Sequence, residues 1–179
     1  MEKVGGGGQW LCHGYTGRLI FGIIPNMKKH FLWLVLPALA GCLSSAPRPA
    51  VNWLLDPQVE ERVAAVSVAV PYDGTRIAVL RADGSVAFDA FNVFAAKPSA
   101  LLKAAVVCPR AKGEVIVRRL ALDCRRPGLR EARVELLLLA GGKAAAGAAA
   151  VDAASGNYSA AFAQAFEQAL REARKTAGK

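Results

Sequence analysis

The sequence predicts a single domain of the α+β class: a mainly antiparallel sheet with two helices packed on one face. Three observations support this class. Segments that alternate apolar and polar residues, typical of half-buried strands, occupy much of residues 51–152. A short segment that opens with a proline and a long C-terminal segment both have helical character. Glycine-containing turns separate several of the strands, which favours antiparallel pairing between neighbours.

Residues 27–42 carry the pattern of a bacterial lipoprotein signal. Met27 is followed by two lysines and then by an apolar run of about ten residues, which is too short to span a bilayer. The run ends in the letters LAGC, of which the last two are Gly41 and Cys42. We therefore expect cleavage between Gly41 and Cys42, and lipidation of Cys42.

This signal divides the chain into four parts. Residues 27–41 are the expected signal peptide, residues 42–50 a lipidated tether rich in serine, proline and alanine, and residues 51–176 the single α+β domain. We interpret residues 1–26 as a mis-assigned start, with a genuine N-terminal extension as the alternative. Cleavage would leave about 138 of the 179 residues, enough for one hydrophobic core.

The distribution of histidine argues against most enzyme classes. Both histidines, His13 and His30, precede Cys42. The processed chain would therefore lack an imidazole for acid–base catalysis, for a nucleophile relay or for metal binding. Its sequence also lacks a nucleophile elbow, a phosphate loop and a metal-ligand spacing. We expect a protein that is not an enzyme and that uses no cofactor and no metal.

The first half of the domain is predicted to form strands. Residues 51–55 form a short first strand, and valines alternate with small residues over 61–72 until a proline closes that strand. Residues 75–90 form a hairpin whose tight turn is Asp83-Gly84. A short helix then begins at Pro98 and ends near residue 107.

Residues 114–152 are predicted to form a meander of three strands, separated by proline–glycine and glycine–glycine turns. In the first strand the apolar residues change faces, which predicts a bulge at Arg118-Arg119. The third strand consists almost wholly of alanine and glycine, which are poor strand formers, so a helix over residues 144–150 is the alternative. As a strand, its small side chains would suit a sheet face against which a bulky element packs closely.

A long amphipathic helix is predicted to begin at Asn157. Its apolar stripe repeats at helical spacing, and we interpret the stripe as core packing against the sheet, with a docking face as the alternative. The residues of the stripe are Tyr158, Phe162, Phe166, Leu170 and Ala173.

Cys108 and Cys124 are the two cysteines that would remain beside the lipidated one. The expected oxidising compartment allows a disulfide between them. However, the strand predicted over residues 114–123 would span roughly 30 Å and separate the two thiols. We therefore favour two free, buried thiols over the bond.

The chain has a formal net charge of +9, and its positive charge is concentrated in residues 110–133. Eight arginines and lysines there face three carboxylates, an excess of five. A solvated strand surface is the simplest interpretation, and contact with anionic headgroups or an acidic partner is the functional one. Nucleic acid is disfavoured, because interleaved aromatic residues are missing. The candidate contact residues are Arg118, Arg119, Arg125 and Arg126.

The order of these parts resembles the ABC-type transport auxiliary lipoproteins, a family that includes the paraquat-inducible-type outer-membrane lipoprotein. The matching features are the lipobox at Cys42, the early strand NWLL, the hairpin that leads into a helix, the strand meander and the closing helix NYSAAFAQAFEQALREA. The resemblance covers roughly the whole domain.

The resemblance implies a non-catalytic role at the outer membrane. Such proteins dock a periplasm-spanning protein of the mammalian-cell-entry type, which is served by an ABC permease and ATPase and carries lipid. A leucine rather than an aspartate after Cys42 also favours the outer membrane, by the lipoprotein sorting rule. Homo-oligomers are a further expectation from the family. Two alternatives remain: an assembly lipoprotein of an outer-membrane machine, such as the lipopolysaccharide translocon, and a small periplasmic module that binds an apolar ligand.

Overall fold

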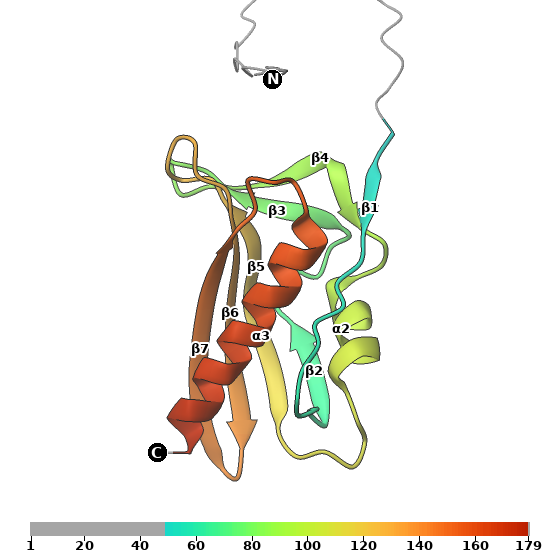
Figure 1. Cartoon of the computed structure of the whole chain (residues 1–179), viewed down its shortest axis with the longest axis vertical. Coiled ribbons are helices and arrows are strands. Elements are labelled where there is room, and N and C mark those ends of the chain that lie inside the picture. Colours follow the sequence, from blue (N-terminus) through green and yellow to red (C-terminus); the bar gives the residue numbers. More distant parts are fainter. Residues whose placement is uncertain (1–48, 179) are drawn as a thin grey trace, which may run out of the picture. The chain divides into compact units, whose positions relative to one another are not determined.

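The computed structural model describes residues 49–178, which form a seven-stranded sheet and two helices (Figure 1). The expected α+β class is confirmed. The sheet order is β1-β4-β3-β5-β6-β7, and β2 also pairs with β5. The elements are β1 (Val51–Trp53), β2 (Ala65–Val68), β3 (Arg76–Leu80), β4 (Val86–Phe94), α2 (Pro98–Val106), β5 (Glu114–Asp123), β6 (Glu131–Ala140), β7 (Lys143–Asp152) and α3 (Tyr158–Ala177).

β5 is the central strand. Its first half pairs in parallel with β2 and its second half in parallel with β3, while β6 runs antiparallel along its other side. The ladders between β3 and β4, β5 and β6, and β6 and β7 are antiparallel, as the sequence predicted. The parallel pairs that β5 makes with β2 and β3, and that β1 makes with β4, were not predicted, so the sheet is mixed.

The meander contains the predicted bulge. Val117 pairs with Leu136 and Arg119 pairs with Glu135, so Arg118 is the extra residue of β5. The bulge moves the apolar side chains on both sides of it to the same face of the sheet, where they join the core. The prediction of a change of face at Arg118-Arg119 is therefore confirmed.

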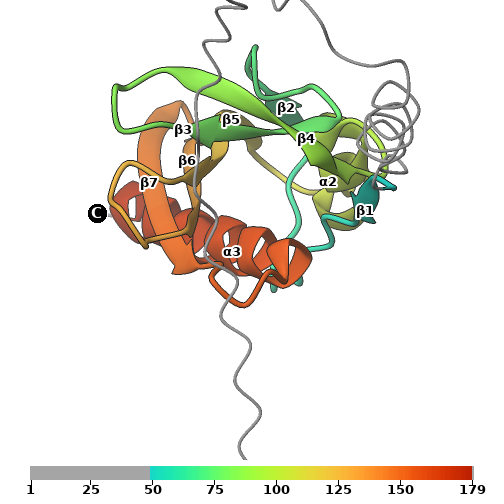
Figure 2. The same ribbon diagram turned by 90° about the horizontal axis from the view of Figure 1, so that it is seen from above.

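Both helices cover the same face of the sheet, and their side chains share one core (Figure 2). The side chain of Asn157 caps α3, because its Oδ1 accepts a hydrogen bond from the backbone N–H of Ala160 at 3.2 Å. The whole predicted stripe of α3 is buried in this core, which confirms core packing over a docking face.

The alanine-rich segment is strand β7, and the helical alternative over residues 144–150 is wrong. All ten of its residues pair with β6 without a shift in register. The element that packs closely against it is α3. A β-carbon added to Gly147 would lie 1.9 Å from the carbonyl oxygen of Ala169, so only glycine allows this approach.

Two predicted strands are shorter than expected. β1 ends at Trp53 rather than at residue 55. The alternating segment over residues 61–72 forms β2 only as far as Val68, and the backbone N–H of Ala69 makes a last bond to Val117. The side chain of Val70 follows in the turn and is 90% exposed. Neither helix in the described part of the chain has the length and apolar character needed to span a bilayer.

The domain has two ends (Figure 1). The N-terminal end contains β1, the turn between β3 and β4, and the loop after β5. The start of α3 also lies there, because the ring centroids of Trp53 in β1 and Tyr158 in α3 are 5.4 Å apart. The C-terminal end contains the turn at Gly141-Gly142 and the last turn of α3. The 20-residue helix separates them by about 30 Å.

Candidate functional site

The expected lipid attachment site lies outside the described residues. Gly41 and Cys42 both precede residue 49, the first that the structure describes. The lipobox and its cleavage therefore remain predictions from the sequence.

Cys108 and Cys124 are free thiols at opposite ends of β5. The backbone N–H of Cys108 bonds to Val63, beside the start of β5, and that of Cys124 bonds to Leu80 after its end. Both side chains are half-buried. Burial raises the pKa of the Cys124 thiol above its usual range, which keeps it protonated near neutral pH. Arg130 lies beside the Cys124 thiol and favours its charged form, but the effect of burial is larger.

The four candidate arginines do not form one contact site. Arg118 and Arg119 lie in the middle of β5, and Arg125 and Arg126 follow its end, roughly 20 Å further along the strand. Arg119 and Arg125 are held by carboxylates, whereas Arg118 and Arg126 are exposed and make no ion pair within residues 49–178. Contact of this basic stretch with anionic headgroups or an acidic partner stays a prediction, and Arg118 and Arg126 are the exposed positions for it.

The carboxylates belong to a chain of ion pairs on the sheet face opposite the helices. Glu135 Oε1 accepts from Arg119 Nη1 at 2.6 Å and from Arg133 Nε at 2.9 Å. Arg133 also lies 3.6 Å from Asp123 Oδ2. Asp123 in turn accepts three side-chain hydrogen bonds from Arg125, the shortest from Nη2 at 2.6 Å and from Nε at 2.9 Å. The chain thus links three arginines across β5 and β6.

Asp123 is the anchor of this chain. It is the one buried charged residue of residues 49–178, with 6% of its surface exposed. Hydrogen bonds from Arg125 lower the pKa of its carboxyl from 3.8 to about 2. Asp123 and Glu135 were not singled out from the sequence. They are identified by the register between β5 and β6, which pairs Arg119 with Glu135 and places Arg133 opposite Ala121, two residues before Asp123. The arrangement fixes these charges in place.

We expect the Asp123 pairs to make the domain sensitive to acid. The folded-state pKa lies below the unfolded value, so the stabilisation is complete above about pH 5 and is lost as the pH falls toward about 2, with up to about 2 kcal/mol at stake. Urea unfolding between pH 7 and pH 2.5 measures this loss. Asp123→Asn should be less stable at pH 7 and should lose less on acidification. An unchanged acid profile would contradict the role, and Asp56→Asn, at an exposed position, is the control.

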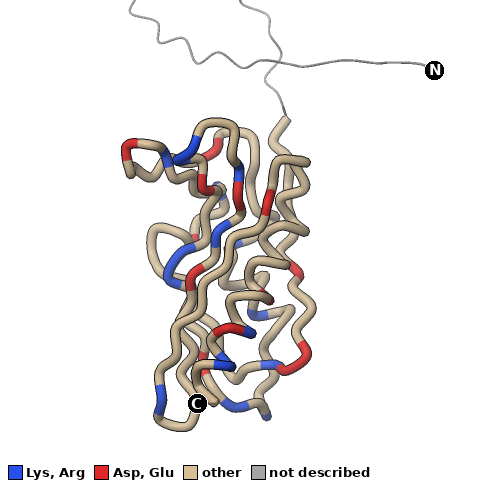
Figure 3. Tube along the Cα trace, turned by 60° about the vertical axis from the view of Figure 1, so that its left-hand side comes forward, with Lys and Arg blue, Asp and Glu red and all other residues tan. Residues whose placement is uncertain are grey.

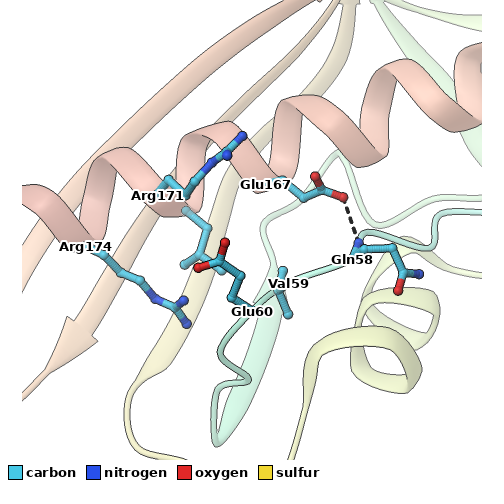
Figure 4. A pocket seen from close by; sticks show the side chains of 7 residues that line it. Gln58, Val59, Glu60, Glu167, Arg171 and Arg174 are labelled. Atoms are coloured by element: carbon cyan, nitrogen blue, oxygen red, sulfur yellow. Dashed lines mark hydrogen bonds between the residues drawn. The ribbon is translucent and has the colours of Figure 1, made fainter.

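A small cavity lies between α3 and the segment that joins β1 to β2 (Figure 4). Its volume is about 50 Å³, which is room for a few water molecules and far below that of a drug-sized ligand site. The backbone N–H of Gln58 donates to Glu167 at 2.7 Å across it, and Glu60, Arg171 and Arg174 complete its charged lining. The hydrogen bond from Gln58 to Glu167 holds the segment against α3. The cavity itself is too small for a lipid.

A broader open depression of about 870 Å³ lies at the C-terminal end. Basic and acidic residues are interspersed along much of the domain (Figure 3), but the lining of this depression is mainly basic. Arg174 pairs with Glu61, while four cations of the lining make no ion pair within the described range. These four are Arg62, Lys112, Lys143 and Arg171. Such a surface can accept acidic side chains.

The described residues contain no cluster of three His, Cys, Asp or Glu side chains suited to a metal ion.

No family model matches this chain, and no curated protein matches it. One similar solved structure is that of the protein XCC0632 from Xanthomonas campestris, described as a DUF330 protein. It is 22% identical over 69% of this chain and 82% of that one, with a TM-score of 0.45.

A second similar structure is that of an uncharacterized protein, at 15% identity. The match covers 70% of this chain and 98% of that one, with a TM-score of 0.53. At such low identity, this similarity shows that the domain shares its fold with a protein of known structure.

Proposed function

We propose that this chain is a lipid-anchored periplasmic lipoprotein, held at the outer membrane, that serves as a non-catalytic auxiliary component of an ABC-linked lipid transport system of the mammalian-cell-entry type. The observation that carries the proposal is the order of features from Met27 to Cys42: positive charge, apolar run, small residues and cysteine. A short tether and one folded domain follow it, as expected for an anchored adaptor.

The charge distribution of the domain is consistent with docking. Its central arginines are neutralised by Asp123 and Glu135, and the Cys124 thiol stays protonated. The basic depression at the C-terminal end provides a surface for acidic side chains of a periplasm-spanning partner.

The alternative of a small apolar-ligand module receives less support. Such a ligand would lie between the sheet and α3, where the fully buried rings of Phe162 and Phe166 already fill the core. The close approach of α3 to Gly147 leaves no layer of space at this interface. The other alternative is an assembly role in another outer-membrane machine, such as the lipopolysaccharide translocon. It would use the same lipid anchor and docking domain as our proposal, with a different protein partner.

Intact mass spectrometry of the protein purified from membranes tests the anchor. We expect a species that starts at Cys42 and carries added acyl mass, and we expect Cys42→Ser to abolish both cleavage and acylation. A soluble, unmodified chain that retains Met27 would contradict the proposal. The transport role predicts further that a mammalian-cell-entry protein co-purifies in mild detergent with the acylated protein. Co-purification of lipopolysaccharide-translocon subunits would favour the alternative.

A further inference from the structure

The exposed apolar side chains of the domain gather at its N-terminal end. Six large apolar residues are exposed in residues 49–178, and only Val70 lies away from β1 and β4. The other five lie on these two paired strands or directly after β1. We call them the apolar rim: Val51, Leu54, Val86, Phe88 and Phe91.

The two aromatic rings of the rim stand on a fixed backbone. Asp89 interrupts the alternation of β4, because its Oδ1 accepts from the backbone N–H groups of Phe91 and Asn92 at 2.8 and 2.9 Å. Asn92 is fixed in turn by the indole N–H of Trp53, at 3.0 Å. Phe88 and Phe91 remain 45% and 47% exposed on either side of Asp89. Single exposed apolar residues are common on protein surfaces, but these five line one end of the domain on both faces of the sheet, which suits a contact made by that end.

The position of the rim identifies what covers it. The chain enters the domain at Val51, which follows Cys42 by nine residues, so the two are separated by at most about 30 Å. If Cys42 is acylated, which rests on the function proposed above, the N-terminal end is the end held near the bilayer. A tether this short keeps the rim at a high effective concentration at the membrane surface, where a weak contact suffices.

We infer that the apolar rim lies in the headgroup region of the membrane that carries the lipid anchor. Phenylalanine, leucine and valine side chains partition into this region, while neighbouring arginines contact lipid phosphates. Arg81 and Arg126 are exposed at the same end, in the turn after β3 and the loop after β5. The anchor fixes the protein to the membrane, and the rim sets its orientation. The basic depression at the opposite end then faces away from the bilayer, toward a periplasmic partner.

Tryptophan quenching by brominated lipid tests this orientation. Trp53 is the sole tryptophan after residue 41, so Trp53→Phe provides a background without tryptophan in the processed protein. Probe and control both lose the bond from Trp53 to Asn92, and the Asp89 bonds to the backbone of Phe91 and Asn92 remain in both. Phe88→Trp places the probe in the rim, and Val70→Trp is the matched control at an exposed apolar position beside the middle of β5. Both acylated proteins are reconstituted into phosphatidylcholine–phosphatidylglycerol vesicles, with and without phosphatidylcholine brominated on one acyl chain.

We expect brominated lipid to lower the emission of the indole at position 88 by roughly half, because the rim would insert to a depth of about 5–10 Å. The emission of the indole at position 70 should stay unchanged. Adding Phe91→Ser to the Phe88→Trp protein should reduce the quenching. No quenching at position 88, or equal quenching at both positions, would overturn the inference; in the first case the rim would instead be a protein-docking surface. Mass spectrometry of the same samples reports acylation separately, so a missing anchor is distinguished from an undocked rim.

Discussion

A Gly147→Ala variant is expected to lose about 3 kcal/mol or more of its free energy of unfolding, because the clash it creates is with backbone atoms that cannot rotate away. The added β-carbon would lie 1.9 Å from the carbonyl oxygen of Ala169 and 2.9 Å from the amide nitrogen of Ala173. α3 must therefore move away from β7, which opens the core that the helix covers. Urea unfolding followed by circular dichroism at neutral pH measures the loss.

Gly74→Ala is the matched control for this substitution. Its added β-carbon would meet no atom closer than 3.9 Å, at the carbonyl oxygen of Pro71. We expect this variant to unfold within about 0.5 kcal/mol of the parent, as most surface substitutions do. If the two alanine variants were equally stable, the close contact between α3 and β7 would be refuted.

The alanine-rich strand shows how local propensity and tertiary packing compete. Alanine favours a helix, and the sequence alone left a helix over residues 144–150 as an alternative. The strand forms because β6 supplies a full ladder and because Gly147 allows α3 to pack against it. The small side chains predicted a close neighbour, and α3 could be expected to be that neighbour since its long apolar stripe needs a sheet face.

Most other elements could also be predicted, because each has a local signal. The hairpin follows from Asp83-Gly84, α2 from Pro98, and the bulge at Arg118 from the change of apolar face along one strand. The order of the strands has no such signal. β3 lies beside β5 only because the chain crosses over through β4 and α2, and a hairpin pattern does not report which strand its open edge will meet.

The surfaces of the domain were harder to predict than its core. The sequence grouped four arginines by proximity along the chain, but cross-strand register joins Arg119 and Arg125 to Glu135 and Asp123 and separates the pairs. The apolar rim was missed because Asp89 breaks the alternation that a strand pattern assumes. Exposure depends on neighbours from distant parts of the chain, and residue spacing alone does not supply it.

Truncation of Phe162 is expected to be similarly severe. This ring is fully buried in the core between α3 and the sheet, and its centroid lies 5.6 Å from that of Phe94 in an edge-on contact. Phe162→Ala should cost about 3–5 kcal/mol through lost burial, the cavity left behind and the lost aromatic pair. That is a large part of the total stability of a domain of this size, so the variant is expected to be unfolded or close to it at 37 °C.

Phe162→Leu keeps the test quantitative if the alanine variant does not fold. It retains most of the buried volume, and its midpoint of unfolding should fall between those of Phe162→Ala and the parent. Phe91→Ala removes the same ring from a position that is 47% exposed and should cost about 1 kcal/mol or less. Equal effects at positions 162 and 91 would mean that Phe162 is not in the core, and the stripe of α3 would then be available for docking.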